Sequence, residues 1–98
     1  MEIIKELNGN DLVLKLQGRL DTTTAPELEQ ELKNSLPGVQ ALTIDMEGLE
    51  YISSAGLRVV LFAQKTMNRQ GSMVVRGAGP MIMEVFDITG FSDILNIQ

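Results

Sequence analysis

The chain has 98 residues, carries a formal charge of −5 from 8 basic and 13 acidic residues, and contains neither cysteine nor histidine. Its length fits a single domain, which we expect to span residues 1–98. The absence of cysteine excludes disulfides, thiolate catalysis and Cys-based metal sites. The absence of histidine removes the commonest general base. The acidic balance argues against nucleic acid and anionic membranes as partners, because both attract a basic surface.

The N-terminal residues predict a hairpin of two strands. Leucines at positions 12, 14 and 16 alternate with other side chains, which is typical of a strand with one buried face. An Asn-Gly-Asn-Asp turn precedes them, and apolar residues precede the turn. We therefore expect paired strands near residues 2–7 and 11–18.

A helix and a buried strand are predicted next. Thr24 and Glu27 form a capping box around Pro26, which favours a helix start because proline lacks an N–H that this position does not need. Leucines follow at helical spacing until a Pro-Gly pair ends the helix. The short apolar run 41–46 then predicts a buried strand.

The second half of the chain predicts two more helices. The broad apolar stripe from 54 to about 68 indicates a helix packed on the sheet, and residues 73–75 indicate a short strand. Gly79-Pro80 begins a third helix that ends at Gly90, and residues 94–97 suggest a last strand or turn. The order is β-β-α-β-α-β-α-β, so we expect an α/β fold with a mixed sheet packed with helices.

Nothing in the sequence predicts membrane insertion. The chain opens without a secretory signal, and no apolar run approaches the ~20 residues that span a bilayer. We expect a cytoplasmic protein that is a monomer and needs no cofactor.

Independent catalysis is disfavoured by the residue types present. A serine nucleophile at Ser53 or Ser54 would need a base, and no lysine stands at a spacing that suggests one. The carboxylates of Asp21, Asp45 and Glu47 match no calcium or magnesium loop. The glycines at 77–79 lack the lysine of a phosphate-binding loop. We therefore expect a binding protein and not an enzyme.

Two polar loops are the candidate functional segments. Residues 19–24 follow the second predicted strand, and residues 50–56 follow the third. Both could lie at the same end of a mixed sheet, where loops on a rigid scaffold carry function.

In the second loop, Ser54 has two physical interpretations. It is either the N-cap of the following helix or an accessible hydroxyl at a helix start that tolerates a phosphate. Gly56 in the first turn weakens the helix slightly, which indicates that another group needs close access at this position.

The motifs G-R-L-D at 18–21, T-A-P at 24–26 and L-E-Y-I-S-S-A-G-L-R at 49–58 together resemble the STAS-domain anti-sigma-factor antagonists of bacteria. The likeness extends over nearly the whole chain. It implies a partner-switching protein: the unphosphorylated antagonist binds an anti-sigma factor that is also a GHKL-type serine kinase, and so frees the sigma factor. Phosphorylation releases the antagonist, and a metal-dependent serine phosphatase resets it.

The resemblance also implies site residues. The phosphorylated serine of the family falls on Ser54, with Ser53 as the fallback, and the family's loop aspartate falls on Asp21. Two positions depart from the family pattern, because Ser53 replaces its usual aspartate and Ala55 replaces its second hydroxyl residue. The expected partner-binding residues are Asp21, Thr22, Thr23, Ser53, Ala55, Gly56, Leu57 and Arg58.

An alternative hypothesis is a STAS domain that is not switched by phosphorylation. In it, the chain is a stand-alone STAS subunit that regulates a membrane transporter or another signalling complex without phosphorylation. Ser53 and Ser54 would then act only as helix caps and contacts.

Overall fold

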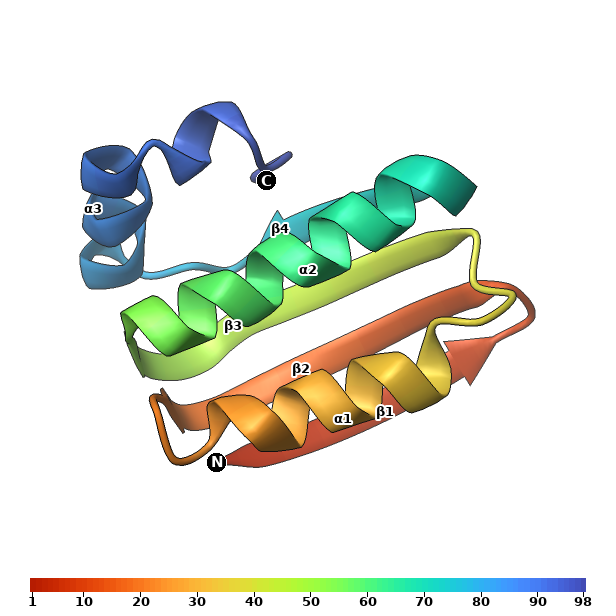
Figure 1. Ribbon diagram of the computed structural model, residues 1–98. Coiled ribbons are helices and arrows are strands. Elements are labelled where there is room, and N and C mark those ends of the chain that lie inside the picture. Colours follow the sequence, from red (N-terminus) through yellow and green to blue (C-terminus); the bar gives the residue numbers. More distant parts are fainter.

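A four-stranded sheet, in the order β1-β2-β3-β4, forms the frame of the protein (Figure 1). The computed structural model describes all residues, 1–98. The elements in chain order are β1 Glu2–Asn8, β2 Asp11–Leu20, α1 Ala25–Ser35, β3 Ala41–Ile52, α2 Ser54–Gln70, β4 Ser72–Arg76, α3 Pro80–Thr89 and a 3-10 helix Phe91–Asp93. This mixed sheet packed with helices confirms the predicted α/β fold class.

The strand directions bring the two polar loops to one edge of the sheet. β1 pairs antiparallel with β2, whereas β2 with β3 and β3 with β4 are parallel pairs. The carboxyl ends of parallel neighbours meet at the same edge. Leu20 and Ile52, the last residues of β2 and β3, are register partners. The prediction that both loops lie at the same end is confirmed.

The hydrophobic core lies between the sheet and its helices. α1 and α2 cross the same face of the sheet (Figure 1), and the core holds 24 buried apolar residues from strands and helices together. The alternating leucines of β2 point into it: Leu12, Leu14 and Leu16 are each no more than 1% exposed. Period-2 alternation therefore correctly identified the buried face of this strand.

The strand β3 is twice as long as the predicted run 41–46. A register shift interrupts its pairing with β2, since Lys15 opposes Asp45 while Gln17 opposes Gly48. The extra residue shifts the phase of the strand so that Leu49 is buried, and a second register shift, between Gly18 and Arg19 of β2, shifts it back so that Ile52 is buried as well. A strict alternation pattern cannot follow a strand through such a bulge.

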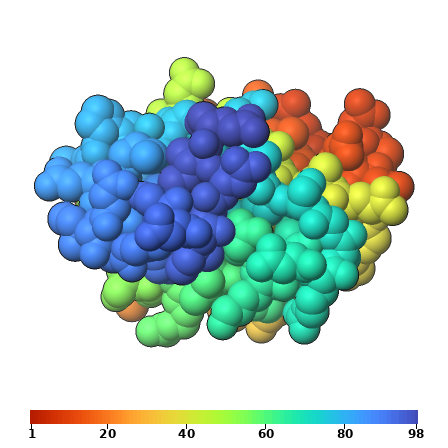
Figure 2. Space-filling model, turned by 90° about the horizontal axis from the view of Figure 1, so that it is seen from above, coloured from red at the N-terminus to blue at the C-terminus, as the bar shows by residue number.

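The predicted last strand is replaced by a short 3-10 helix and a single bridge between Ile97 and Val75. Phe91 stacks on Phe86 with ring centroids 6.4 Å apart, and Leu95 is buried. Figure 2 shows the C-terminal residues lying between α3 and α2. The segment docks through these apolar anchors, and the bridge is its only pairing with the sheet.

Gly71, between α2 and β4, allows a close backbone approach. A Cβ atom there would lie 1.9 Å from the carbonyl oxygen of Gln40 and 2.7 Å from its carbonyl carbon. The contact occurs where β4 joins the sheet, because Ser72 donates its backbone N–H to the Gln40 oxygen at 2.9 Å.

We predict that Gly71→Ala lowers the free energy of unfolding by about 2 kcal/mol or more, since backbone atoms must move to relieve the clash. Urea denaturation followed by circular dichroism measures the effect. Gly79→Ala is the matched control, because nothing lies within 4 Å of the position that its Cβ would take and its φ is −74°. Equal stability of Gly71→Ala and the parent would contradict the close approach.

Candidate functional site

The site is built from the two loops at the carboxyl ends of β2 and β3. The backbone N–H of Ser53 donates to the carbonyl oxygen of Leu20 at 2.9 Å, which joins the start of one loop to the start of the other. Each loop then leads directly into a helix, α1 or α2. The site is therefore a junction of two strand ends and two helix starts.

Asp21 organises the first loop. Its Oδ1 accepts hydrogen bonds from the backbone N–H groups of Thr23 at 3.0 Å and Thr24 at 3.1 Å. The backbone N–H of Thr24 is the main reason that the pKa of Asp21 lies below its ordinary value, with further lowering from Thr23, the Thr24 hydroxyl and the charge of Arg19. Donors to a carboxylate favour its charged form. Asp21 is thus ionised and held in a turn.

The predicted capping box at Thr24 is wrong. Thr24 is the N-cap residue of α1, but its side chain makes no capping hydrogen bond. Its hydroxyl instead donates to the carbonyl oxygen of Arg19 at 2.8 Å and accepts from the backbone N–H of Asp21 at 2.8 Å. The Thr24 hydroxyl is therefore engaged within its own loop.

Arg19 and Tyr51 form a contact that no sequence motif predicted. The Arg19 guanidinium carbon lies 4.2 Å from the centroid of the Tyr51 ring, a cation–π arrangement, and its Nε lies 3.9 Å from Oδ2 of Asp21. The two side chains meet because Arg19 and Tyr51 are register partners across β2 and β3. This pair could be predicted only from the strand register, which cannot be read from the sequence.

The two serines have different places. Ser53 is the N-cap of α2: its backbone is extended and its Oγ accepts from the backbone N–H of Gly56 at 3.3 Å. Ser54 is the first residue of the helix and is exposed. No side chain or backbone group hydrogen-bonds to its hydroxyl. The capping role considered for Ser54 therefore belongs to its neighbour.

Gly56 and Leu57, both expected at the partner surface, are buried. A Cβ atom on Gly56 would lie 2.7 Å from Cγ of Leu20 and 3.0 Å from its carbonyl oxygen. The close approach suspected at this glycine is thus made by the end of β2. We expect these two residues to support the surface from beneath and not to touch a partner.

A hollow of about 200 Å³ lies between α1 and α2 beside the two loops. Three of the expected partner-binding residues, Thr22, Ala55 and Arg58, line it. The other lining residues are Ala25, Pro26, Glu29 and Val59. The loops therefore share one surface depression, in which small side chains predominate.

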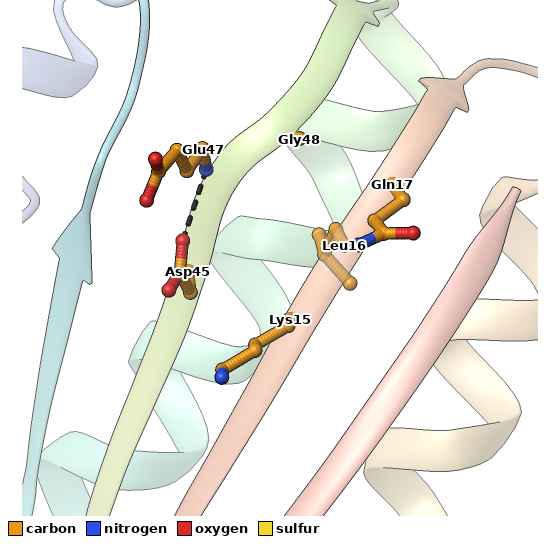
Figure 3. A pocket seen from close by; sticks show the side chains of 6 residues that line it. All are labelled: Lys15, Leu16, Gln17, Asp45, Glu47 and Gly48. Carbon is orange, nitrogen blue, oxygen red and sulfur yellow. Dashed lines mark hydrogen bonds between the residues drawn. The ribbon is translucent and has the colours of Figure 1, made fainter.

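A second hollow, of about 300 Å³, lies at the bulge between β2 and β3 (Figure 3). Its lining residues are Lys15, Leu16, Gln17, Asp45, Glu47 and Gly48. The buried Asp45 carboxylate is already satisfied, because it accepts from the Glu47 backbone N–H at 3.0 Å and pairs with Nε of Arg76 at 3.3 Å.

No group of three potential metal-ligating side chains occurs in the structure. None of the helices has the length and apolar character that a membrane span requires.

We predict that Ser53→Ala lowers the free energy of unfolding by about 1 kcal/mol, because an N-cap oxygen is lost. Ser54→Ala should change it by less than about 0.5 kcal/mol, since the exposed hydroxyl has no partner. Urea denaturation of the parent and both variants makes the comparison. A larger loss for Ser54→Ala than for Ser53→Ala would reverse the assignment of the cap.

The Asp21 turn predicts a pH dependence of stability. Folding lowers the pKa of Asp21, so its contribution is complete above the ordinary value of 3.8 and is lost as the pH falls through the lower folded-state pKa. The stability difference between the parent and Asp21→Asn should therefore shrink as the pH falls from about 6 through that range. Thermal unfolding at a series of pH values measures it, and a difference that stays constant would refute the assigned turn.

Comparisons with known proteins agree with this geometry. Residues 2–98 match the model of the STAS domain family. A putative anti-sigma factor antagonist, BtrV of Bordetella bronchiseptica, is 40% identical over 88 residues, which cover 88% of this chain and 76% of that protein. The anti-sigma-B factor antagonist of Listeria monocytogenes is 33% identical over 98 residues, covering 97% and 85%.

The fold is also shared with a solved structure, that of the Bacillus cell fate determinant SpoIIAA in the phosphorylated form. The TM-score is 0.78 at 18% identity, and the alignment covers 99% of this chain and 91% of that chain. The resemblance drawn from the loop motifs is confirmed by the match over almost the full length, and the chain belongs to the STAS domain family.

Proposed function

We propose that this protein is an anti-sigma-factor antagonist that acts by binding and not by catalysis. Unphosphorylated, it binds an anti-sigma factor that is also a serine kinase of the GHKL type, and the sigma factor is released. The names of the relatives from Bordetella and Listeria support this role. Sigma factors and their regulators act in the cytoplasm, so the protein works there as one STAS domain over residues 1–98.

The observation that carries the proposal is the exposed hydroxyl of Ser54. It stands at the first position of α2, where backbone N–H groups lack helical partners and the helix dipole is positive. A phosphate placed there gains donors and leaves the cap intact, because the cap is made by Ser53. Ser53 is a poorer acceptor than Ser54, since it is half-buried and its oxygen is engaged.

The phosphoryl transfer is a reaction of the kinase on this chain. The Ser54 oxygen forms a bond to the γ-phosphorus of ATP, the bond from that phosphorus to the β–γ bridging oxygen breaks, and ADP leaves. The hydroxyl proton passes to a base of the kinase. A metal-dependent phosphatase later transfers the phosphoryl group to water and restores the hydroxyl. The phosphorylated SpoIIAA structure shows that a protein of the same fold accepts such a group.

Phosphorylation gates binding through charge. It adds about 1.5–2 negative charges to a surface that contacts the partner when unmodified. That surface draws on both loops: Thr22, Thr23 and Arg58 are exposed, Ala55 is half-buried, and Asp21 holds the first loop in shape. A new charge inside such a contact must be desolvated on binding, which weakens the complex.

We predict that incubation with the cognate kinase and ATP adds one phosphate to the parent chain and none to Ser54→Ala. Intact-mass spectrometry followed by peptide sequencing measures the modification. Ser53→Ala is the control and should still accept the phosphate, because it retains the exposed hydroxyl.

Phosphate that persists in Ser54→Ala and disappears in Ser53→Ala would move the acceptor to Ser53. No mass shift with a kinase that is active on another substrate, combined with constitutive binding, would favour instead a STAS subunit that acts without phosphorylation.

A further inference from the structure

Arg58 stands one helical turn after Ser54 on the surface of α2. Residues four apart lie on the same side of a helix, with Cβ atoms about 5–6 Å apart. Both residues lie within the helix Ser54–Gln70, and both are exposed. An acidic group at the first position and a basic group four residues later is the more favourable order for an ion pair. A phosphate on Ser54 would thus meet the Arg58 guanidinium within its own helix.

Arg58 has no ion-pair partner within the chain, whereas the other cation of the site and the acidic residue across the hollow are both paired. Arg19 is held by Tyr51 and Asp21. Glu29, across the hollow that Arg58 lines, pairs with Lys33 at 3.2 Å. None of the five ion pairs in the structure includes Arg58. It is the free cation of the site.

The remaining unpaired cations of α2 are too far away to compete. Lys65 and Arg69 follow Ser54 by about 16 Å and about 22 Å along the helix axis, at a rise of about 1.5 Å per residue. Both are exposed and belong to the other half of the helix. Arg69 therefore provides a matched control: it has the same chemistry and helix and lies remote from the site.

We propose that Arg58 serves both states of the switch. This inference rests on the proposed function. In the unphosphorylated protein, the free guanidinium docks against a carboxylate of the anti-sigma factor. In the phosphorylated protein, the phosphate of Ser54 takes the same guanidinium as its counterion. Phosphorylation then removes a docking group at the same time as it adds a repelling charge.

The chemistry of the guanidinium suits both partners. Its planar fork of N–H donors binds carboxylate or phosphate in a bidentate manner. The hollow at its side holds Thr22 and Ala55, whose small side chains leave room for an incoming carboxylate side chain. The phosphate of Ser54 competes favourably with a carboxylate of the partner for the Arg58 guanidinium, since it is attached one turn away on the same helix.

The first test needs no kinase. Phosphoserine is incorporated at position 54 during translation, and the second pKa of its phosphate, ordinarily about 6, is followed by 31P NMR. We expect this pKa to rise by about half a unit in Arg58→Gln, because the cation that favours the dianion is lost. Arg69→Gln should leave it at the parent value. The helix dipole acts equally in all three proteins, so the difference isolates Arg58.

An identical phosphate pKa in the parent and Arg58→Gln would overturn the phosphate half of the proposal, provided that the circular dichroism spectra match. Because the phosphoserine is installed directly, this outcome is independent of whether any kinase modifies Ser54. A failure of the switch in the cell and a failure of the Arg58 pairing are thereby distinguishable.

The second test addresses the docking half with the anti-sigma factor that phosphorylates the parent chain as the probe. Unphosphorylated Arg58→Gln should bind it about 10-fold more weakly, as expected for loss of one charge-assisted contact. Arg58→Lys should recover part of the loss, and Arg69→Gln should bind as the parent does. Isothermal titration calorimetry measures the affinities. Parent-like binding by Arg58→Gln would show that no carboxylate docks there.

Discussion

The parallel pairing of β2 with β3, closed at the register partners Leu20 and Ile52, is the constraint on which the site depends. It brings the carboxyl ends of both strands to one edge, where Ser53 donates to the Leu20 carbonyl oxygen. Gly56 then lets the first turn of α2 lie directly on Leu20, since any larger residue would clash. The start of α2 is thereby fixed against the end of β2, and the two loops form one surface.

On that fixed edge, the two adjacent serines differ in their hydrogen bonding. Ser53 caps α2, and Ser54 keeps a free hydroxyl. The resemblance implied an aspartate at position 53, where this chain has serine. Serine and aspartate are comparably good N-cap residues, so replacing one by the other preserves the helix start. What changes is the local charge, because serine brings one negative charge fewer to the surface beside Ser54.

In the proposed switch, charge gives the surface its two states. Around Ser54, Arg19 and Glu29 have internal partners, and Arg58 has none. Arg58 is therefore the cation through which this surface would respond. Two other devices keep the frame rigid beneath this change: Asp21 holds its turn through backbone donors, and Leu57 anchors α2 in the core. A phosphate on Ser54, as proposed, would therefore alter recognition without requiring a change of fold.

The sequence by itself determined the order of the main elements, the buried face of β2 and the positions of the two polar loops, because alternation, helical spacing and loop motifs are local signals. The tertiary structure decided the features that depend on strand register and on atomic contacts. The bulge near Gly48 lengthened β3, the final segment docked through Phe91 with one bridge to Val75, and the Thr24 hydroxyl turned toward the Asp21 loop. The Arg19–Tyr51 contact and the choice of Ser53 as cap also arose there. The bulge, the final bridge and the Arg19–Tyr51 contact rest on strand pairing, whereas the Thr24 and Ser53 hydrogen bonds rest on the backbone geometry of their turns. Spacing along the chain encodes neither.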